Sequence, residues 1–255
     1  MLNEKIKKTK IASGKDDIAK YYEKYAQSWD HRFGKNKSAI HFLNKRLDIL
    51  KDLAQFSPKD KVLEIGCGTA FHLVALSPNF NNGTGVDISP QMLSVAKKHA
   101  LLIDNNKLKF ILDDAETLKK IPSNSFDVVF FIGLIEHLVN PKACLKNCRR
   151  ILKQDGVLIG FTPNRYSPWY GIIGPLFRAS TTHLTSDKHY SAKEIRNMLS
   201  HVGYKKQLIK YWGFIPGGDI PDFLFKILKP IEIIAEISPL RFLAGGIAFR
   251  AKKGK

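Results

Sequence analysis

The sequence predicts an α/β protein: a Rossmann-like, mostly parallel sheet with helices on both faces. Two observations support this prediction. From residue 61 to residue 162, apolar runs with the length of strands alternate with helical segments, as they do in parallel sheets. The first run ends in a glycine-rich turn and the second ends in a carboxylate, an arrangement typical of nucleotide-binding units.

The core of this fold is expected over residues 57–162. Ser89 and Pro90 favour a helix start, because proline suits the first helical position, and Gly156 is expected to end a later helix. Strands are expected at 61–66, 83–88, 107–112, 126–132 and 156–162, and helices at 69–77, 90–103 and 141–152.

The segments on either side of the core are less regular. Residues 1–16 read as a flexible basic tail and residues 17–255 as a single domain. An aromatic-rich helix is expected from Ile18 to about Asp30, and a second helix over 38–55. One face of the second helix is apolar, with Ile40, Leu43, Leu47 and Leu50. After the core, a helix is expected over 191–202, a strand over 205–212, a helix over 221–237 and a last strand over 246–251.

Composition limits the class and the compartment. The chain has 255 residues, of which 44% are hydrophobic and 25% charged, as in globular proteins. Its three cysteines are too sparse for a disulfide framework and indicate a reducing compartment, so a cytoplasmic location is expected. No apolar run approaches the ~20 residues of a membrane-spanning helix.

The net charge of +18 would attract phosphate backbones and anionic membrane surfaces alike. Most of the lysines are dispersed along the chain, which is typical of a solvated surface, and no nucleic-acid-binding module is recognisable. Nucleic acid is therefore the less favoured partner. Peripheral contact with the anionic inner membrane surface stays open, and the sequence does not determine the oligomeric state.

The glycine-rich turn indicates which nucleotide binds. A dinucleotide site needs a third glycine where this chain has the bulky Phe71 after Gly66 and Gly68. Glu64 would repel a pyrophosphate but suits a ligand that carries an ammonium and a sulfonium, such as S-adenosylmethionine. Asp87, at the end of the second strand, can accept hydrogen bonds from both ribose hydroxyls.

The chain resembles the class I S-adenosylmethionine-dependent methyltransferases, in particular the ubiquinone-biosynthesis O-methyltransferases and their methyltransferase type 11 relatives. The resemblance rests on short motifs in the family's order, which are Glu64-x-Gly66-x-Gly68, Asp113-Asp114-Ala115-Glu116, Ser125-Phe126-Asp127-Val128-Val129, Ile135-Glu136-His137-Leu138 and Tyr190-Ser191-Ala192-Lys193-Glu194. It implies a seven-stranded sheet whose last strand is antiparallel and lies beside the sixth. It also implies that residues 163–190 and 213–245 are insertions or a lid on the acceptor side.

The resemblance implies a set of cofactor contacts. Met92 falls where a side chain covers the adenine, Asp114 would reach the adenine amino group, and Tyr25 would close over the methionine end. The alternative for Tyr25 is that it packs with Tyr21 and Trp29 on the sheet. The full expected set is Tyr25, Glu64, Gly66, Cys67, Gly68, Asp87, Ile88, Met92, Asp114, Ala115 and Gly133.

Methyl transfer requires an aligned acceptor, and it requires a base only if the acceptor arrives protonated. His137, after the fourth strand, is the candidate base; the alternative is that it only packs beside the cofactor. A metal site built from His183, His189 and Asp187 is not expected, because no element fixes their spacing. The candidate acceptor-binding residues are Asn164, Tyr166, Trp169, His183 and His189.

The predicted function is methyl transfer to a small-molecule or lipid-linked acceptor, with oxygen favoured. Gly133-Leu134-Ile135-Glu136 stands where methyltransferases of planar amines carry an Asn-Pro-Pro-Tyr-like segment. The alternatives are an RNA or protein methyltransferase, a non-catalytic S-adenosylmethionine-binding protein, and a dinucleotide oxidoreductase, which Phe71 disfavours. The apolar 221–237 helix, flanked by lysines, is either a buried lid or a contact for a bilayer or lipid-like acceptor.

Overall fold

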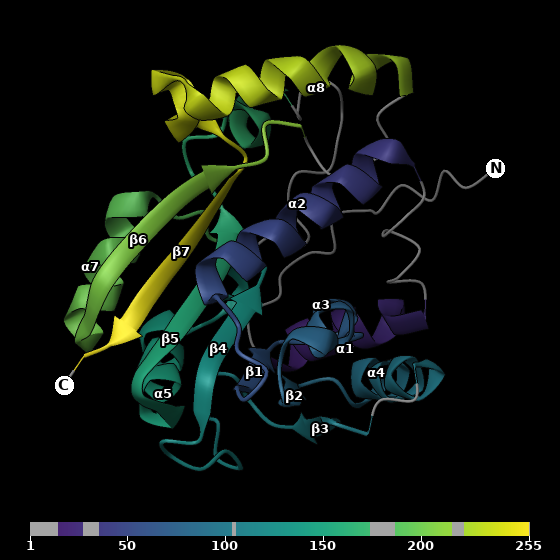
Figure 1. Cartoon of the computed structure of the whole chain (residues 1–255), viewed down its shortest axis with the longest axis vertical. Coiled ribbons are helices and arrows are strands. Elements are labelled where there is room, and N and C mark those ends of the chain that lie inside the picture. The colour runs from purple at the N-terminus through teal and green to yellow at the C-terminus, as the bar shows by residue number, and fades with distance from the viewer. Residues whose placement is uncertain (1–14, 28–35, 104–105, 174–186, 216–221, 255) are drawn as a thin grey trace.

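The computed structural model describes residues 15–27, 36–103, 106–173, 187–215 and 222–254. The described residues contain a seven-stranded sheet with the strand order β3-β2-β1-β4-β5-β7-β6, whose arrangement can be followed in Figure 1. The five strands from β3 to β5 are parallel, whereas β7 is antiparallel to both β5 and β6. The strands are β1 (Lys61–Ile65), β2 (Asn82–Asp87), β3 (Leu108–Leu112), β4 (Phe126–Ile132), β5 (Leu152–Pro163), β6 (Tyr204–Trp212) and β7 (Gly246–Lys253). The predicted fold class is confirmed.

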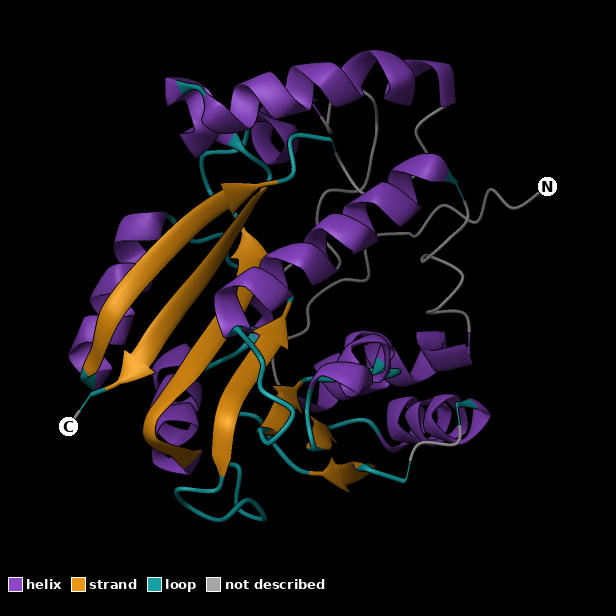
Figure 2. Ribbon diagram, viewed as in Figure 1, coloured by secondary structure: helices purple, strands orange, loops and turns teal. Residues whose placement is uncertain are grey.

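Helices cover both faces of this sheet (Figure 2). Buried side chains of α2, α3 and α4 form one apolar core against the sheet, and those of α5 and α7 form a second core on the other face. The α-helices are α1 (Lys15–Tyr25), α2 (Lys37–Ala54), α3 (Phe71–Leu76), α4 (Pro90–Leu102), α5 (Pro141–Ile151), α7 (Ala192–Val202) and α8 (Asp222–Ile237). Short helical turns are η2 (Ser77–Asn79), η3 (Ile135–His137), η4 (Trp169–Ile173, a π-turn) and η5 (Pro239–Leu243).

Local sequence signals account for several helix ends. The Ser89 side chain accepts a hydrogen bond from the Met92 backbone N–H and so caps α4. Ser191 and Glu194 cap the start of α7 reciprocally, each side chain bonding to the other's backbone N–H. Gly203 ends α7 with φ of 90°, a conformation in which a side chain would be strained.

Two boundaries and one residue of a predicted apolar face differ from the expectations. Helix α1 begins at Lys15, so Lys15 and Asp16 belong to the helix and not to the tail; the first 14 residues lie outside the described part. Helix α5 ends at Ile151 and β5 begins at Leu152, so Gly156 lies within the strand and does not end the helix. Ile40 is 44% exposed, so it does not belong to the buried face of α2.

Helix α8 has an unusual orientation. It lies across the end of the molecule, beside α2 and η5 (Figure 1). Its buried side chains are Phe225 and the charged Glu232, whereas Ile227, Ile231 and Ile234 are more than half exposed. The expectation of a buried lid helix is therefore wrong for its apolar face. No helix in the described residues is long and apolar enough to cross a membrane.

Candidate active site

The turn after β1 forms the floor of a cavity at the carboxyl end of the parallel strands, where ligands bind in open α/β sheets. Gly66 and Gly68 have φ of 65° and 53°, values that side chains rarely tolerate. A Cβ on Gly66 would also lie 2.8 Å from Cδ1 of Leu134. Asp87, at the end of β2, accepts hydrogen bonds from the backbone N–H groups of Gly68 at 2.7 Å and Ser89 at 2.9 Å.

Glu64 places a buried carboxylate under this turn. Its side chain accepts a hydrogen bond from the Leu73 backbone N–H at 3.1 Å and is only 2% exposed. Burial raises the pKa of Glu64 well above its ordinary value, and the nearby Asp87 charge raises it further, against the opposing effects of Leu73 and Arg46. A cationic ligand group next to Glu64 would therefore stabilise the carboxylate form of this side chain.

Arg46, on α2, brings a buried guanidinium to the same cavity. It lies over the rings of Phe42 and Trp212, with distances of 4.8 and 5.5 Å from its central carbon to the ring centroids. Its Nη1 is 3.3 Å from Nε2 of His72, and its Nε has no hydrogen-bond partner within the described residues. Burial lowers the pKa of Arg46 to about 10. A buried cation with an unused donor is suited to an anionic ligand group.

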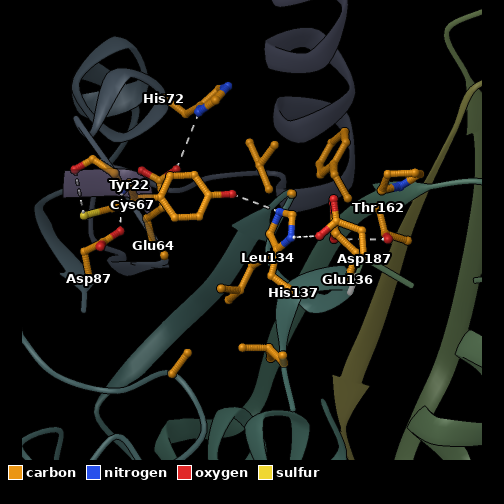
Figure 3. A pocket seen from close by; sticks show the side chains of 18 of the residues that line it. Tyr22, Glu64, Cys67, His72, Asp87, Leu134, Glu136, His137, Thr162 and Asp187 are labelled. Atoms are coloured by element: carbon orange, nitrogen blue, oxygen red, sulfur yellow. Dashed lines mark hydrogen bonds and ion pairs between the residues drawn. The ribbon is translucent and has the colours of Figure 1, made fainter. Parts of the chain in front are cut away.

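His137, in η3 after β4, is held between a carboxylate and a phenol (Figure 3). Its Nδ1 is 2.6 Å from Oδ1 of Asp187, and its Nε2 is 3.0 Å from Oη of Tyr22 on α1. The Asp187 carboxylate can only accept at Nδ1, so the neutral imidazole presents Nε2 as its acceptor.

The surroundings of His137 set its protonation. Burial lowers its pKa, but the hydrogen bond to Asp187 and the charges of Glu136 and Asp187 outweigh burial, so the pKa is raised above its ordinary value. The pKa of Tyr22 is raised well above its usual range, chiefly by burial, so this phenol stays protonated and can donate to Nε2. Glu136, also buried, accepts a hydrogen bond from Thr162 at 3.2 Å.

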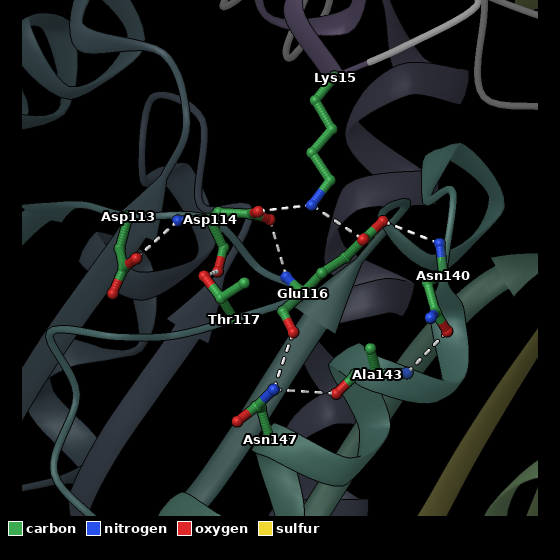
Figure 4. A network of polar contacts seen from close by, with 8 residues as sticks. All are labelled: Lys15, Asp113, Asp114, Glu116, Thr117, Asn140, Ala143 and Asn147. Atoms are coloured by element: carbon green, nitrogen blue, oxygen red, sulfur yellow. Dashed lines mark hydrogen bonds and ion pairs between the residues drawn. The ribbon is translucent and has the colours of Figure 1, made fainter.

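A network of polar contacts that includes the cavity-lining residues Asp113, Asp114 and Glu116 joins α1 to the loop after β3 (Figure 4). Nζ of Lys15 lies 2.6 Å from Asp114 and 2.9 Å from Glu116, so the start of α1 is tied to the loop after β3. The second Asp114 oxygen accepts from the backbone N–H of Glu116 at 2.9 Å. Helix α1 therefore crosses the cavity, with Lys15 at one end and Tyr22 at the other.

The cavity has a volume of about 460 Å³, within the range of small-molecule sites. Every predicted cofactor-binding residue except Tyr25 lines it. The Tyr25 ring packs on Tyr21 at 4.9 Å, and Tyr22 takes the position at the cavity instead. The other lining residues with aromatic or titratable side chains are Lys15, Phe42, Arg46, Phe71, His72, Asp113, Glu116, Glu136, His137, Phe161, Trp169, Tyr170, Asp187, His189, Trp212 and Phe214.

The structure places only some of the predicted acceptor-binding residues at the cavity. Trp169 and His189 line the cavity. Asn164 does not; it is fully buried, and its amide donates to the backbone carbonyls of Phe242 and Ala244 at 2.8 Å. Tyr166 is 56% exposed and lies outside the cavity, and His183 lies outside the described residues. No cluster of His, Cys, Asp and Glu side chains in the described residues could hold a metal ion.

Among the residues of this site that sequence reasoning did not assign to it are Lys15, Tyr22 and Arg46, and Asp187 was considered only as a metal ligand. Arg46 left one signal, since a charged residue interrupts the buried face of an amphipathic helix at helical spacing from Phe42 and Ile49. Asp187 and Tyr22 left none, because each is far from His137 in the chain and only the fold brings them together.

The cofactor-binding core matches a known family. The model of a methyltransferase domain family matches residues 63–160. Residues 63–160 therefore form a methyltransferase domain of the class I, S-adenosylmethionine-dependent kind.

Its curated relatives include ubiquinone biosynthesis O-methyltransferases. The one from Actinobacillus pleuropneumoniae serotype 7 is 34% identical over 157 residues, which are 60% of this chain and 66% of the relative. The one from Coxiella burnetii is 35% identical over 153 residues, 59% of this chain and 63% of the relative. The matches thus span just under two thirds of these relatives.

Solved structures agree on the fold alone. A S-adenosylmethionine-dependent methyltransferase from Thermotoga maritima has a TM-score of 0.67 at 20% identity, covering 92% of this chain and 99% of that one. The phosphoethanolamine N-methyltransferase 2 of Haemonchus contortus, solved with phosphomonomethylethanolamine and S-adenosylhomocysteine, has a TM-score of 0.63 at 18% identity. That match covers 94% of this chain and 59% of the other.

Proposed function

We propose that this protein transfers the methyl group of S-adenosylmethionine to a hydroxyl oxygen of a small-molecule or lipid-linked acceptor, with His137 as general base. The observation that carries the proposal is the Asp187–His137–Tyr22 chain, in which Nε2 of His137 already accepts a hydrogen bond from a phenolic hydroxyl inside the cavity. A base that is oriented by a carboxylate and faces a hydroxyl is the arrangement that O-methylation requires.

The residues around the turn fit the cofactor. In this proposal, Glu64 binds the methionine ammonium, and Arg46 offers its unused Nε donor to the carboxylate. Asp87 faces the ribose, Asp114 faces the adenine amino group, and Met92 packs beside the adenine ring. When bound, S-adenosylmethionine supplies the activated methyl group, so the protein has to position the acceptor and exclude water.

The acceptor side of the cavity is apolar and aromatic. Phe161, Trp169, Tyr170, Trp212 and Phe214 line it, with His189 and Glu136 as polar groups. Such walls suit an aromatic or prenyl-bearing molecule better than a polar one. The names of the curated relatives, which are ubiquinone biosynthesis O-methyltransferases, also support an oxygen acceptor.

The test is transfer of labelled methyl groups from S-adenosylmethionine to a panel of probes: a catechol, a short-chain prenylated hydroxyphenol, phosphoethanolamine and bulk RNA. We expect label on the hydroxylated aromatic probes. His137→Ala should lower the turnover by about 10² or more and leave S-adenosylhomocysteine binding unchanged. Unaltered turnover in H137A would remove the base assignment, and transfer to RNA or phosphoethanolamine alone would remove the acceptor class. Binding of S-adenosylhomocysteine without transfer to any probe favours the non-catalytic alternative.

A further inference from the structure

We infer that the outer face of α8 and η5 docks the protein onto an anionic lipid bilayer. The inference starts from the reversed polarity of α8. A helix at a protein surface normally turns its apolar stripe inward and its charged face to water. Helix α8 does the opposite along most of its length, with a buried carboxylate on the inside and isoleucines outside.

The inner face of α8 is fixed by polar contacts. Glu232 is 2% exposed, and its Oε1 accepts hydrogen bonds from the backbone N–H groups of Phe214 at 2.9 Å and Ile215 at 3.1 Å. Its Oε2 lies 2.6 Å from Nε2 of His41 and 3.0 Å from Nζ of Lys45, both on α2. These contacts satisfy a buried charge, so rotating the helix to hide its isoleucines would leave that charge unpaired. The contacts of Glu232 therefore fix the orientation of α8, in which its isoleucines point outward.

The outer face forms a continuous apolar stripe. Phe223, Ile227, Ile231, Ile234 and Ile237 recur at helical spacing and are between 55% and 81% exposed. The next turn, η5, extends the surface with Leu240 at 57% and Phe242 at 44%. We call this set of seven side chains the apolar stripe. Large contiguous apolar surfaces on a protein mark a partner or a membrane.

Charge selects the bilayer as the occupant. Lys226, Lys229 and Arg241 lie on α8 and η5 and are exposed, and the exposed acidic residue at the start of α8, Asp222, is paired with Lys37 at 3.1 Å. The whole chain carries a net charge of +18, which opposes the approach of a second copy of itself but favours an anionic membrane. An apolar face bordered by lysines, lying flat and too short to span, is the pattern of an interfacial helix.

The position of α8 relative to the cavity fits this docking. Phe214 lines the cavity together with Trp212 and Gly213. Its backbone N–H donates a hydrogen bond to Glu232 of α8. The helix that would rest on lipid thus also supports one wall of the proposed acceptor site. The inference does not depend on the proposed acceptor, because it concerns a surface and not the reaction.

The experiment is co-sedimentation of the full chain with vesicles, scored by bound fraction. Vesicles of phosphatidylcholine with phosphatidylglycerol are compared with phosphatidylcholine alone, at low and high salt. We expect binding to the anionic vesicles that weakens in high salt. The triple variant I227S/I231S/I234S should bind roughly tenfold or more weakly. The double variant K226E/K229E should also bind roughly tenfold or more weakly, since each lysine near the surface contributes about 1 kcal/mol.

Matched controls come from α4. Leu101 and Leu102 are 76% and 81% exposed, so L101S/L102S removes apolar surface away from α8, and K97E/K98E reverses two exposed lysines there. Each control should bind much more tightly than the α8 variant with the same kind of substitution, because only the general charge or apolar surface has changed, and S-adenosylhomocysteine binding should be unchanged in every variant. Absence of binding to anionic vesicles, or equal loss in the α4 controls, overturns the inference. Light scattering that shows the triple variant turning a dimer into a monomer, with no vesicle binding by the parent, also overturns it in favour of a second copy.

Discussion

The hydrogen bond between His137 and Asp187 determines how the proposed base should respond to pH. The contact raises the pKa of His137, so in the native site the imidazole loses its proton only at a higher pH than a free histidine would. A base works in its deprotonated form, and turnover should therefore rise with pH through this raised pKa.

Asp187→Asn should move this acid limb to lower pH, because the amide no longer stabilises the imidazolium. The maximal rate should fall by roughly 10² or more, since an amide can also hold the wrong tautomer. The measurement is kcat as a function of pH for the parent and D187N. An acid limb in D187N at the same pH as in the parent would mean that another group titrates.

The raised pKa of Glu64 predicts that cofactor binding releases a proton from this carboxyl. Its pKa is raised well above the ordinary value, so this carboxyl keeps its proton to a higher pH than a free glutamate does. A ligand ammonium beside it favours the carboxylate, and binding should expel that proton.

Calorimetric titration of S-adenosylhomocysteine in phosphate and in Tris, whose ionisation enthalpies differ, reports this proton. The apparent binding enthalpy should differ between the two buffers for the parent and agree for Glu64→Gln. By the same linkage, affinity in the parent should increase as the pH rises through the raised pKa of Glu64. A buffer-dependent enthalpy that persists in E64Q would place the proton on a different group.

At the scale of elements, the turn between β1 and α3 depends on two glycines for different reasons. Both have positive φ, so alanine at either position is strained by about 1 kcal/mol. At Gly66 a Cβ also lies 2.8 Å from Leu134, whereas at Gly68 the nearest atom is Sδ of Met92 at 3.9 Å.

Gly66→Ala should therefore lower the free energy of unfolding more than Gly68→Ala does, by roughly 1 kcal/mol or more, as overpacking of a core does. Urea unfolding of both variants measures the difference. In the L134A background, where the clashing side chain is gone, the G66A substitution should cost less free energy of unfolding than it does in the parent. Equal losses in G66A and G68A would show that backbone strain, and not the contact with Leu134, determines the cost.

Some features of the helices and strands could be predicted from the sequence, and others could not. The strands of the core and the helix start at Ser89 and Pro90 were predictable because each signal lies within a few residues. The boundary of β5 was not, because Asp155 and Gly156 resemble a helix end but are accommodated in a register shift between β4 and β5. The orientation of α8 was not predictable either, since periodicity defines two faces without saying which one is buried.

In the candidate site, too, some residues could be predicted from the sequence and others could not. The residues proposed to hold the cofactor lie in short motifs at the ends of consecutive strands, and the fold rule that gathers such ends placed them together. The contacts of His137 with Tyr22 and Asp187 join segments 115 and 50 residues apart, and Arg46 meets His72 across 26 residues. Such pairs depend on side-chain packing that no local pattern encodes.

For the whole molecule, a cavity formed by loops from the whole sheet predicts that the ligand stabilises the entire fold. S-adenosylhomocysteine at about 100 times its Kd should add about 2.7 kcal/mol to the free energy of unfolding. For a chain of this size the Tm should rise by roughly 5 to 10 °C. Differential scanning fluorimetry of the parent and Asp87→Ala measures this shift. A rise in D87A as large as in the parent would show that the ligand binds elsewhere.

The place of β7 in the sheet has a consequence for synthesis of the chain. Of the seven strands of this sheet, Gly246–Lys253 is synthesised after the other six, yet it lies between β5 and β6 and pairs with both. Until it emerges from the ribosome, β5 presents an open edge and β6 has no partner within the sheet. The nascent protein is therefore expected to complete its fold only after translation of these residues, and to need chaperone protection until then.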